Sequence, residues 1–163
     1  MELKIVNFLD FRNLEDYSLN IPDGITLFHG KNGQGKTSVL EAIYFAATGK
    51  SFRTAKVQEL IKYNKEKCGV FLSYKDKIDE KTISIKFSDK KKEFSYNGKR
   101  ITYDDYYGKL NVVSFIPEDI ELITGAPSIR RKFFDEEISQ GDEEYFKNIK
   151  DYSKILKIRN YYL

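Results

Sequence analysis

Short stretches of alternating apolar and polar residues open the chain. Leu3, Ile5 and Phe8 lie near the two-residue period of a strand. A second apolar stretch ends at residues 19–21, where the Pro-Asp-Gly sequence of residues 22–24 is typical of a turn. These patterns predict two strands near the N-terminus.

A short apolar run and a longer one follow, on either side of a glycine-rich segment. The Ile-Thr-Leu-Phe-His run at residues 25–29 predicts a buried strand that ends at His29. Residues 38–48 carry apolar side chains around most of the girth of a helix, and Gly49 is a suitable stop for it. The first third of the chain is therefore expected to be α/β.

The middle of the chain has the pattern of an antiparallel sheet. Residues 69–72 predict a strand, and residues 82–87 alternate as a half-exposed strand does. The Asn-Gly pair at residues 97–98 is the strongest short signal for a hairpin. Residues 110–116 predict a further buried strand, which Pro117 ends.

From residue 118 onward the pattern is helical, with a break at residues 125–128. The last helix is expected to be amphipathic, with an apolar stripe at Tyr145, Ile149, Tyr152 and Leu156 and a lysine stripe at Lys147, Lys150, Lys154 and Lys157. A lysine stripe is usually a solvated helix face, and DNA binding is the alternative. We expect two domains, an α/β lobe at residues 1–117 and the beginning of a helical lobe at residues 118–163.

Composition narrows the class of protein. The 163 residues are 40% hydrophobic and carry 28 Lys and Arg against 25 Asp and Glu, a net charge of +3. This is enough apolar material for a core, but the weak net charge does not by itself indicate nucleic acid. The single cysteine, Cys68, excludes an internal disulfide and a cysteine-rich zinc site, and we expect it to be buried and inert. No apolar run is long enough for a membrane span and no signal peptide is evident, so we expect a cytoplasmic protein with no membrane contact.

One motif indicates nucleotide chemistry. Residues 30–37 fit G-x-x-x-x-G-K-[ST] between an apolar run and a predicted helix, whereas the alternative is a glycine-rich surface turn. Glycines leave backbone amides bare for phosphate, and the helix directs its positive end at the same place. Lys36 is expected to reach the phosphates and Thr37 to coordinate Mg²⁺. The expected nucleotide contacts are Gly30, Lys31, Asn32, Gly33, Gln34, Gly35, Lys36, Thr37 and Ser38.

Six segments, in the same order along the chain, resemble the RecF family of bacterial DNA replication and repair proteins, which belongs with the SMC and Rad50 ATPases. They are residues 8–14 (Phe-Leu-Asp-Phe-Arg-Asn-Leu), 30–43, 49–54 with 59–61, 115–120 (Phe-Ile-Pro-Glu-Asp-Ile), 125–135, and 156–160 with 163.

The resemblance implies an α/β P-loop NTPase fold of ABC-ATPase head type. Such a head has a mixed sheet around the phosphate-loop helix, an additional antiparallel β layer and the start of a C-terminal helical subdomain. It implies ATP with Mg²⁺ as cofactors, Arg12 near the phosphates, and a homodimer that forms with ATP. It also implies single-stranded and double-stranded DNA as partners, and work with RecO and RecR in loading RecA at gaps during the SOS response to DNA damage, at the nucleoid.

The chain departs from this family in length, since RecF proteins are about twice as long and carry the Walker B acids and the ABC signature in their later half. Asp104-Asp105 follows a stretch too short and polar for Walker B, and Glu136-Glu137 lies in a predicted helix. We therefore expect an N-terminal fragment or a truncated protein of an ATPase family, which binds ATP without hydrolysing it.

Several charged residues have two readings. Lys50, Arg53, Arg130 and Arg131 are candidates for DNA phosphate contact, whereas Arg131 also has an i,i+4 ion-pair partner in Asp135. Glu118 and Asp119 either approach Mg²⁺ or water, or cap the helix after Pro117.

Three other functions compete with a DNA-repair ATPase head. They are another SMC-type or ABC-type head, a small stand-alone P-loop kinase, and a passive DNA-binding module whose loop is vestigial. A kinase would need a substrate lid and its own acidic Mg²⁺ partner, and neither is located in the sequence.

Overall fold

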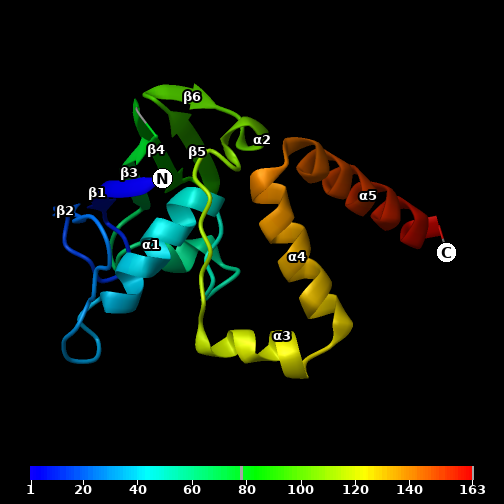
Figure 1. Ribbon diagram of the computed structural model, residues 1–163, viewed down its shortest axis with the longest axis horizontal. Helices are drawn as coiled ribbons and strands as arrows, with labels where there is room; N and C mark the ends of the chain where they lie inside the picture. The colour runs from blue at the N-terminus through cyan, green and yellow to red at the C-terminus, as the bar shows by residue number, and fades with distance from the viewer. Residues whose placement is uncertain (78, 163) are drawn as a thin grey trace. The chain divides into compact units, whose positions relative to one another are not determined.

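The computed structural model describes residues 1–77 and 79–162. The chain divides into two compact units, residues 1–110 and 111–163 (Figure 1). The first unit combines a sheet with helices and the second is helical. The expected α/β class and the helical C-terminal region are both confirmed.

Six strands form the sheet of the first unit, in the order β2-β1-β3-β4-β5-β6 with every neighbour antiparallel. Their bounds are β1 Glu2–Leu9, β2 Ser18–Asn20, β3 Lys67–Asp76, β4 Asp79–Ser88, β5 Lys91–Tyr96 and β6 Lys99–Ile101. The two N-terminal strands and the predicted strands at residues 69–72 and 82–87 are confirmed. So is the hairpin at residues 97–98, where Asn97 and Gly98 have φ angles of 47° and 76°. Positive φ at both turn residues is what a tight two-residue hairpin requires.

One face of this sheet is apolar because its side chains are in register across the strands. Val6 of β1 lies opposite Leu72 of β3, which lies opposite Ile83 of β4. Each of the three is at most 1% exposed. Burial of such a side chain contributes about 1.5–3 kcal/mol.

Helix α1, Lys36–Thr48, packs on the central strands β3 and β4 (cyan in Figure 1). Its buried apolar side chains are Val39, Ala42, Phe45, Ala46 and Ala47. The predicted helix is confirmed, as is Gly49, which adopts a φ of 72° and donates its N–H to the Phe45 carbonyl at 2.8 Å. The short helices η1, Val57–Leu60, and α2, Tyr103–Tyr106, complete the unit.

Side chains from β5 and α2 fix the C-terminal end of α1. The Lys92 ammonium donates to the Gly49 carbonyl at 2.7 Å. The hydroxyl of Tyr103 donates to the Thr48 carbonyl at 2.9 Å, and the hydroxyl of Tyr106 donates to the Ala46 carbonyl. Tyr106 is fully buried. These donors satisfy carbonyls that a helix end leaves without intrahelical partners.

Two predicted buried strands are wrong. Residues 25–29 form no strand, and Ile25 is 99% and Leu27 80% exposed. In the segment 110–116 only Leu110 is buried, while Phe115 is 88% exposed. A strand needs a neighbour for its backbone groups, and neither segment pairs with a strand among the described residues. All neighbouring pairs among the described strands are antiparallel, so the predicted mixed sheet is not what they form.

The second unit consists of η2 Pro117–Ile120, α3 Glu121–Thr124, α4 Pro127–Gly141 and α5 Glu143–Tyr162. Pro127 opens α4, a position at which its missing N–H costs nothing. Gln140 of α4 accepts from the N–H of Val112 at 2.8 Å and donates to the Val112 carbonyl at 3.1 Å, which ties the segment before η2 to this helix. The last helix is confirmed, but none of its described residues is buried.

Cys68 lies in β3 and is buried, as expected, and burial raises the pKa of its thiol to about 12. Among the described helices, none has the length and apolar content to cross a membrane.

Candidate phosphate-binding site

The glycine-rich loop before α1 depends on Gly35. This residue has a φ of 91°, a backbone conformation that is strained for any residue with a Cβ atom. A Cβ atom at this position would lie 2.7 Å from Cδ2 of Leu14. Gly35 therefore lets the loop turn into the helix while it packs against the segment that follows β1.

The N-terminal end of α1 presents backbone donors without an internal acceptor. Gly35 stands at the cap position, no side chain caps the helix, and its first turn carries no acidic residue. The first amides of a helix lack intrahelical partners and form the positive end of its dipole. Such an end attracts anions, phosphate above all.

Lys36 and Thr37 add a charge and a hydroxyl at the same place. The Lys36 ammonium donates to the carbonyls of Gly30 and Lys31, at 2.9 and 2.7 Å, and is thereby held against the loop backbone. Thr37 is exposed in the first turn of α1. The expected ligand for Mg²⁺ is therefore accessible.

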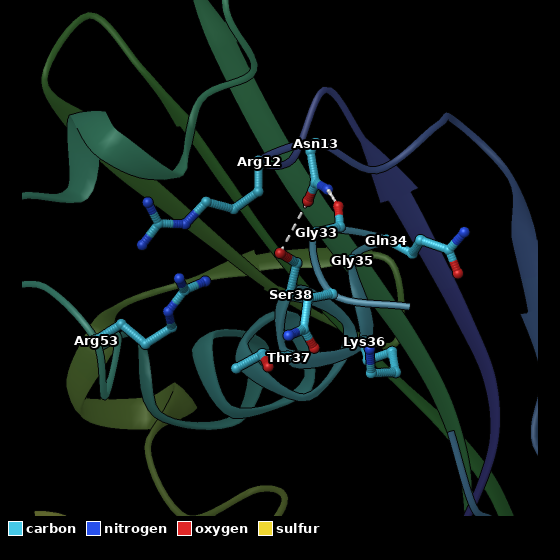
Figure 2. Close-up of a pocket in the computed structure, with 10 residues that line it drawn as sticks. Arg12, Asn13, Gly33, Gln34, Gly35, Lys36, Thr37, Ser38 and Arg53 are labelled. Atoms are coloured by element: carbon cyan, nitrogen blue, oxygen red, sulfur yellow. Dashed lines mark hydrogen bonds between the residues drawn. The ribbon is translucent and has the colours of Figure 1, made fainter. Parts of the chain in front are cut away.

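A cavity of about 460 Å³ lies over the loop. Its lining residues are Arg12, Asn13, Asn32, Gly33, Gln34, Gly35, Lys36, Thr37, Ser38 and Arg53 (Figure 2). The lining has three cationic side chains and no carboxylate. Eight of the ten expected nucleotide contacts line it, and the other two, Gly30 and Lys31, hold Lys36 through their carbonyls.

Arg12 enters this cavity from the turn after β1. Its backbone N–H donates to the Leu60 carbonyl at 2.7 Å, and its guanidinium donates to the Glu59 carbonyl at 2.8 Å. Its Nε and Nη2 groups donate to Glu41 at 3.0 and 2.7 Å. A guanidinium matched to both oxygens of a carboxylate is held in a defined orientation.

Glu41 is a buried carboxylate in α1 that the sequence pattern did not single out. Besides Arg12, it accepts from the Ser51 hydroxyl at 2.6 Å and from Nη1 of Arg53 at 3.2 Å. Burial acts to raise its pKa, but the bonds from Arg12 and Ser51, with the charges of Arg12 and Arg53, hold the pKa below its ordinary value. Glu41 is therefore ionised at neutral pH. The signal in the sequence that could have identified Glu41 is a single acidic residue on the buried side of an otherwise apolar helix.

Asn13 was also missed and braces the loop from the side of β1. It donates from Nδ2 to the Gly33 carbonyl at 2.8 Å, and its Oδ1 accepts from the buried Ser38 hydroxyl at 3.0 Å (dashed in Figure 2). Asn13 directly follows Arg12 in the first segment of the RecF resemblance. Arg12 thus contributes a positive charge to the cavity, and its neighbour Asn13 holds the loop in place.

The four candidate DNA contacts have separate environments. Arg53 lines the cavity, and Lys50 is exposed just after the other end of α1. In the second unit Arg131 is exposed, while Arg130 donates to the carbonyls of Leu122 and Gly125 at 3.3 and 3.0 Å. Arg130 thus ties the end of α3 to α4.

Asp119 has the contacts of a helix cap. Its carboxylate accepts from the N–H of Ile116 at 2.7 Å, and its own N–H donates to the Ile116 carbonyl at 3.0 Å. Within residues 1–77 and 79–162, no three His, Cys, Asp or Glu side chains gather as a metal site. The site nevertheless fits Mg²⁺ with ATP, because this ion is commonly held by one or two protein oxygens, phosphates and water.

Comparison of sequences supports the resemblance. A family model described as an AAA domain matches residues 2–162. The chain is 39% identical over 163 residues to the DNA replication and repair protein RecF of Clostridium perfringens, covering 98% of this chain and 45% of that protein. It is 41% identical over 166 residues to RecF of Macrococcus caseolyticus, covering 100% of this chain and 44% of that protein. The chain therefore spans about half the length of the curated relatives it matches.

Comparison of structures agrees. A structure described as the recombination mediator protein RecF-ATP in the RecFOR pathway matches with a TM-score of 0.90 at 36% identity, over 98% of this chain and 43% of that chain. The SMC head domain from Thermotoga maritima matches with a TM-score of 0.54 at 20% identity, over 64% of this chain and 40% of that chain, a likeness of fold alone. The resemblance to RecF and the α/β head fold of a P-loop ABC ATPase are confirmed.

Proposed function

Because the chain belongs to the AAA domain family, we propose that it is the ATP-binding part of a RecF-type DNA replication and repair protein. The observation that carries the proposal is the cavity over residues 32–38, which is lined by the open end of α1, Lys36 and two arginines and has no carboxylate in its lining. Three cations beside bare helix amides suit a polyphosphate with several negative charges. The solved RecF-ATP structure, similar over nearly this whole chain, supports ATP as that polyphosphate.

The proposed site divides the work among a few groups. Amides of the loop and the first turn of α1 bind phosphate oxygens, and Lys36 neutralises charge on the terminal phosphates. Mg²⁺, held by the Thr37 hydroxyl and the phosphates, supplies further charge neutralisation. Arg12 and Arg53 provide guanidinium donors at the rim of the cavity.

Binding without hydrolysis is the second part of the proposal. The cavity lining contains no acid that would activate water. Of the acidic pair in α2, Asp105 serves the start of that helix, since its carboxylate accepts from the Thr102 hydroxyl at 2.7 Å. Catalytic acids and a signature motif would come from the part of the relatives that this chain does not span.

DNA and protein partners complete the proposal. Lys50, Arg131 and the lysine stripe of α5 are exposed cations suited to DNA phosphates, single-stranded or double-stranded. By its resemblance to a mediator of the RecFOR pathway, the whole protein would act with RecO and RecR as an ATP-dependent dimer. It would load RecA at gaps on the nucleoid, in the cytoplasm. The relatives give no support to the stand-alone kinase alternative.

Isothermal titration calorimetry of the 163-residue chain with Mg-ATP tests the proposal. Lys36→Ala should weaken binding by about 100-fold, since a hydrogen bond to a charged group contributes about 1.5–3 kcal/mol. Lys86→Ala is the matched control, because Lys86 is exposed on β4 and outside the cavity lining. Equal affinity in all three proteins, or no binding by the unchanged chain, would overturn the proposal.

A further inference from the structure

We propose that Glu41 is the positioning residue of this site, a carboxylate that binds no ligand itself but holds Arg12 and Arg53 at the cavity. The inference rests on the proposed ATP site and deepens it. It predicts that triphosphate affinity depends on a negative charge inside the protein.

The geometry of Glu41 carries the inference. Its side chain is fully buried and is not part of the cavity lining, whereas both arginines line the cavity. One oxygen accepts from Arg12 and Ser51, at 2.7 and 2.6 Å. The other accepts from Arg12 and Arg53, at 3.0 and 3.2 Å. Both carboxylate oxygens are therefore engaged from inside the molecule.

The two arginines remain available on their outer side. The side chain of Arg12 is 19% exposed and that of Arg53 is 45% exposed. Figure 2 shows both guanidinium groups on one side of the loop, and each donates to the same oxygen of Glu41. Two positive charges against one buried negative charge leave a net positive charge facing the cavity.

Ser51 extends the same network to the backbone that carries Arg53. Its hydroxyl donates to Glu41 and accepts from the N–H groups of Arg53 and Thr54, at 3.0 and 3.1 Å. The turn after α1 is thus tied to the helix through one carboxylate. The same helix begins with Lys36, so all three cations are fixed relative to one rigid element.

If Glu41 acted through its negative charge alone, removing that charge would have the opposite effect on ATP binding to the one proposed here. Removing a negative charge near a polyanion site should strengthen ATP binding if charge alone decides. If Glu41 positions the arginines, the neutral isostere Gln should weaken ATP binding. In Gln an NH2 group replaces one carboxylate oxygen, and this group cannot accept hydrogen bonds from the arginines. The sign of the change separates the two accounts.

The test is Mg-ATP calorimetry on the 163-residue chain carrying Glu41→Gln. We expect about a tenfold loss of affinity, in the range for one charged hydrogen bond. Glu59→Gln is the matched control, since it removes a negative charge from an exposed residue whose backbone carbonyl, and not its side chain, accepts from Arg12. It should change affinity less than about twofold. Unchanged or tighter binding by a folded Glu41→Gln protein would overturn the inference.

A second variant and a spectroscopic readout cover the case in which Glu41→Gln does not fold. Ser51→Ala keeps the carboxylate and should weaken Mg-ATP about threefold through Arg53; unchanged affinity would contradict the network. The Nε–H resonance of Arg12 should move in Glu41→Gln or, if that variant does not fold, in Glu41→Asp, and a resonance that stays in place would show that Glu41 does not hold the guanidinium. The ATP site itself fails only if the unchanged chain does not bind Mg-ATP or if Lys36→Ala has no effect.

Discussion

The two ends of α1 use their backbone groups in opposite ways. At the C-terminal end, the carbonyls of Ala46, Thr48 and Gly49 accept from Tyr106, Tyr103 and Lys92. At the N-terminal end, Gly35 provides no side-chain cap and the first amides face a cavity. The carbonyls at the C-terminal end have partners within the protein, whereas the amides at the N-terminal end have no capping side chain and are available to an anion.

This difference separates stability from binding along a single helix. A satisfied end fixes α1 to the sheet, so that the open end can keep donors in place without ligand. Glu41 lies between them and connects the helix to two arginines of the cavity. Changes at the C-terminal end should therefore alter stability most, whereas binding should be altered only by changes at the N-terminal end.

The largest expected effect is on stability, from Tyr106→Ala at the C-terminal end. Tyr106 is fully buried, packs on Phe94 with ring centroids 4.8 Å apart and donates to Ala46. Truncation of a buried aromatic costs about 3–5 kcal/mol, measurable as the free energy of unfolding in urea. A loss below about 1 kcal/mol would show that this end does not anchor the helix.

A somewhat smaller effect is expected from Glu41→Gln, with a pH dependence. Breaking a buried ion pair costs about 3 kcal/mol at neutral pH. The network lowers the pKa of Glu41 in the folded state, so the unfolded state binds the proton more readily. The contribution of Glu41 is then fully present above the unfolded pKa, roughly 4.3, and is lost as the pH falls through the lower folded pKa.

Urea titrations of the unchanged chain and of Glu41→Gln between about pH 7 and about pH 3 measure this dependence. The difference in unfolding free energy should shrink at the acidic end. A difference that stays constant with pH would mean that the ionised carboxylate is not what stabilises the fold.

The smallest of these effects compares two loop glycines at the N-terminal end. Gly35→Ala adds a Cβ close to Leu14, whereas Gly33→Ala, at a φ of 82°, meets no atom within 4 Å. Both substitutions strain a positive φ by about 1–2 kcal/mol, so the difference between them isolates the contact with Leu14. We expect Gly35→Ala to be the less stable by about 1 kcal/mol or more in urea unfolding. Equal stabilities would show that the loop does not pack tightly on this segment.

Local signals in the sequence were enough to predict α1, the hairpin at residues 97–98 and the glycine-rich loop at residues 30–37. The helix pattern, Gly49 and Asn97-Gly98 act within a few residues, so each could be predicted from a short window. Apolar character did not reveal that residues 25–29 lie outside the sheet, because a run of apolar residues does not identify its pairing partner.

The rest of the site depends on contacts between distant residues. Arg12 and Glu41 are 29 positions apart, and Asn13 and Ser38 are 25 apart. Spacing along the chain cannot indicate such pairs, and nothing in the sequence indicated that Arg53 lines the cavity. Only the fold brings these groups together.

The most direct test of the central claim is to map the amide resonances of the 163-residue chain by NMR during titration with Mg-ATP. The account predicts the largest shifts at residues 33–38, at the open end of α1, and small ones at residues 46–49. Shifts confined to residues 46–49, or no shifts at either end, would contradict it.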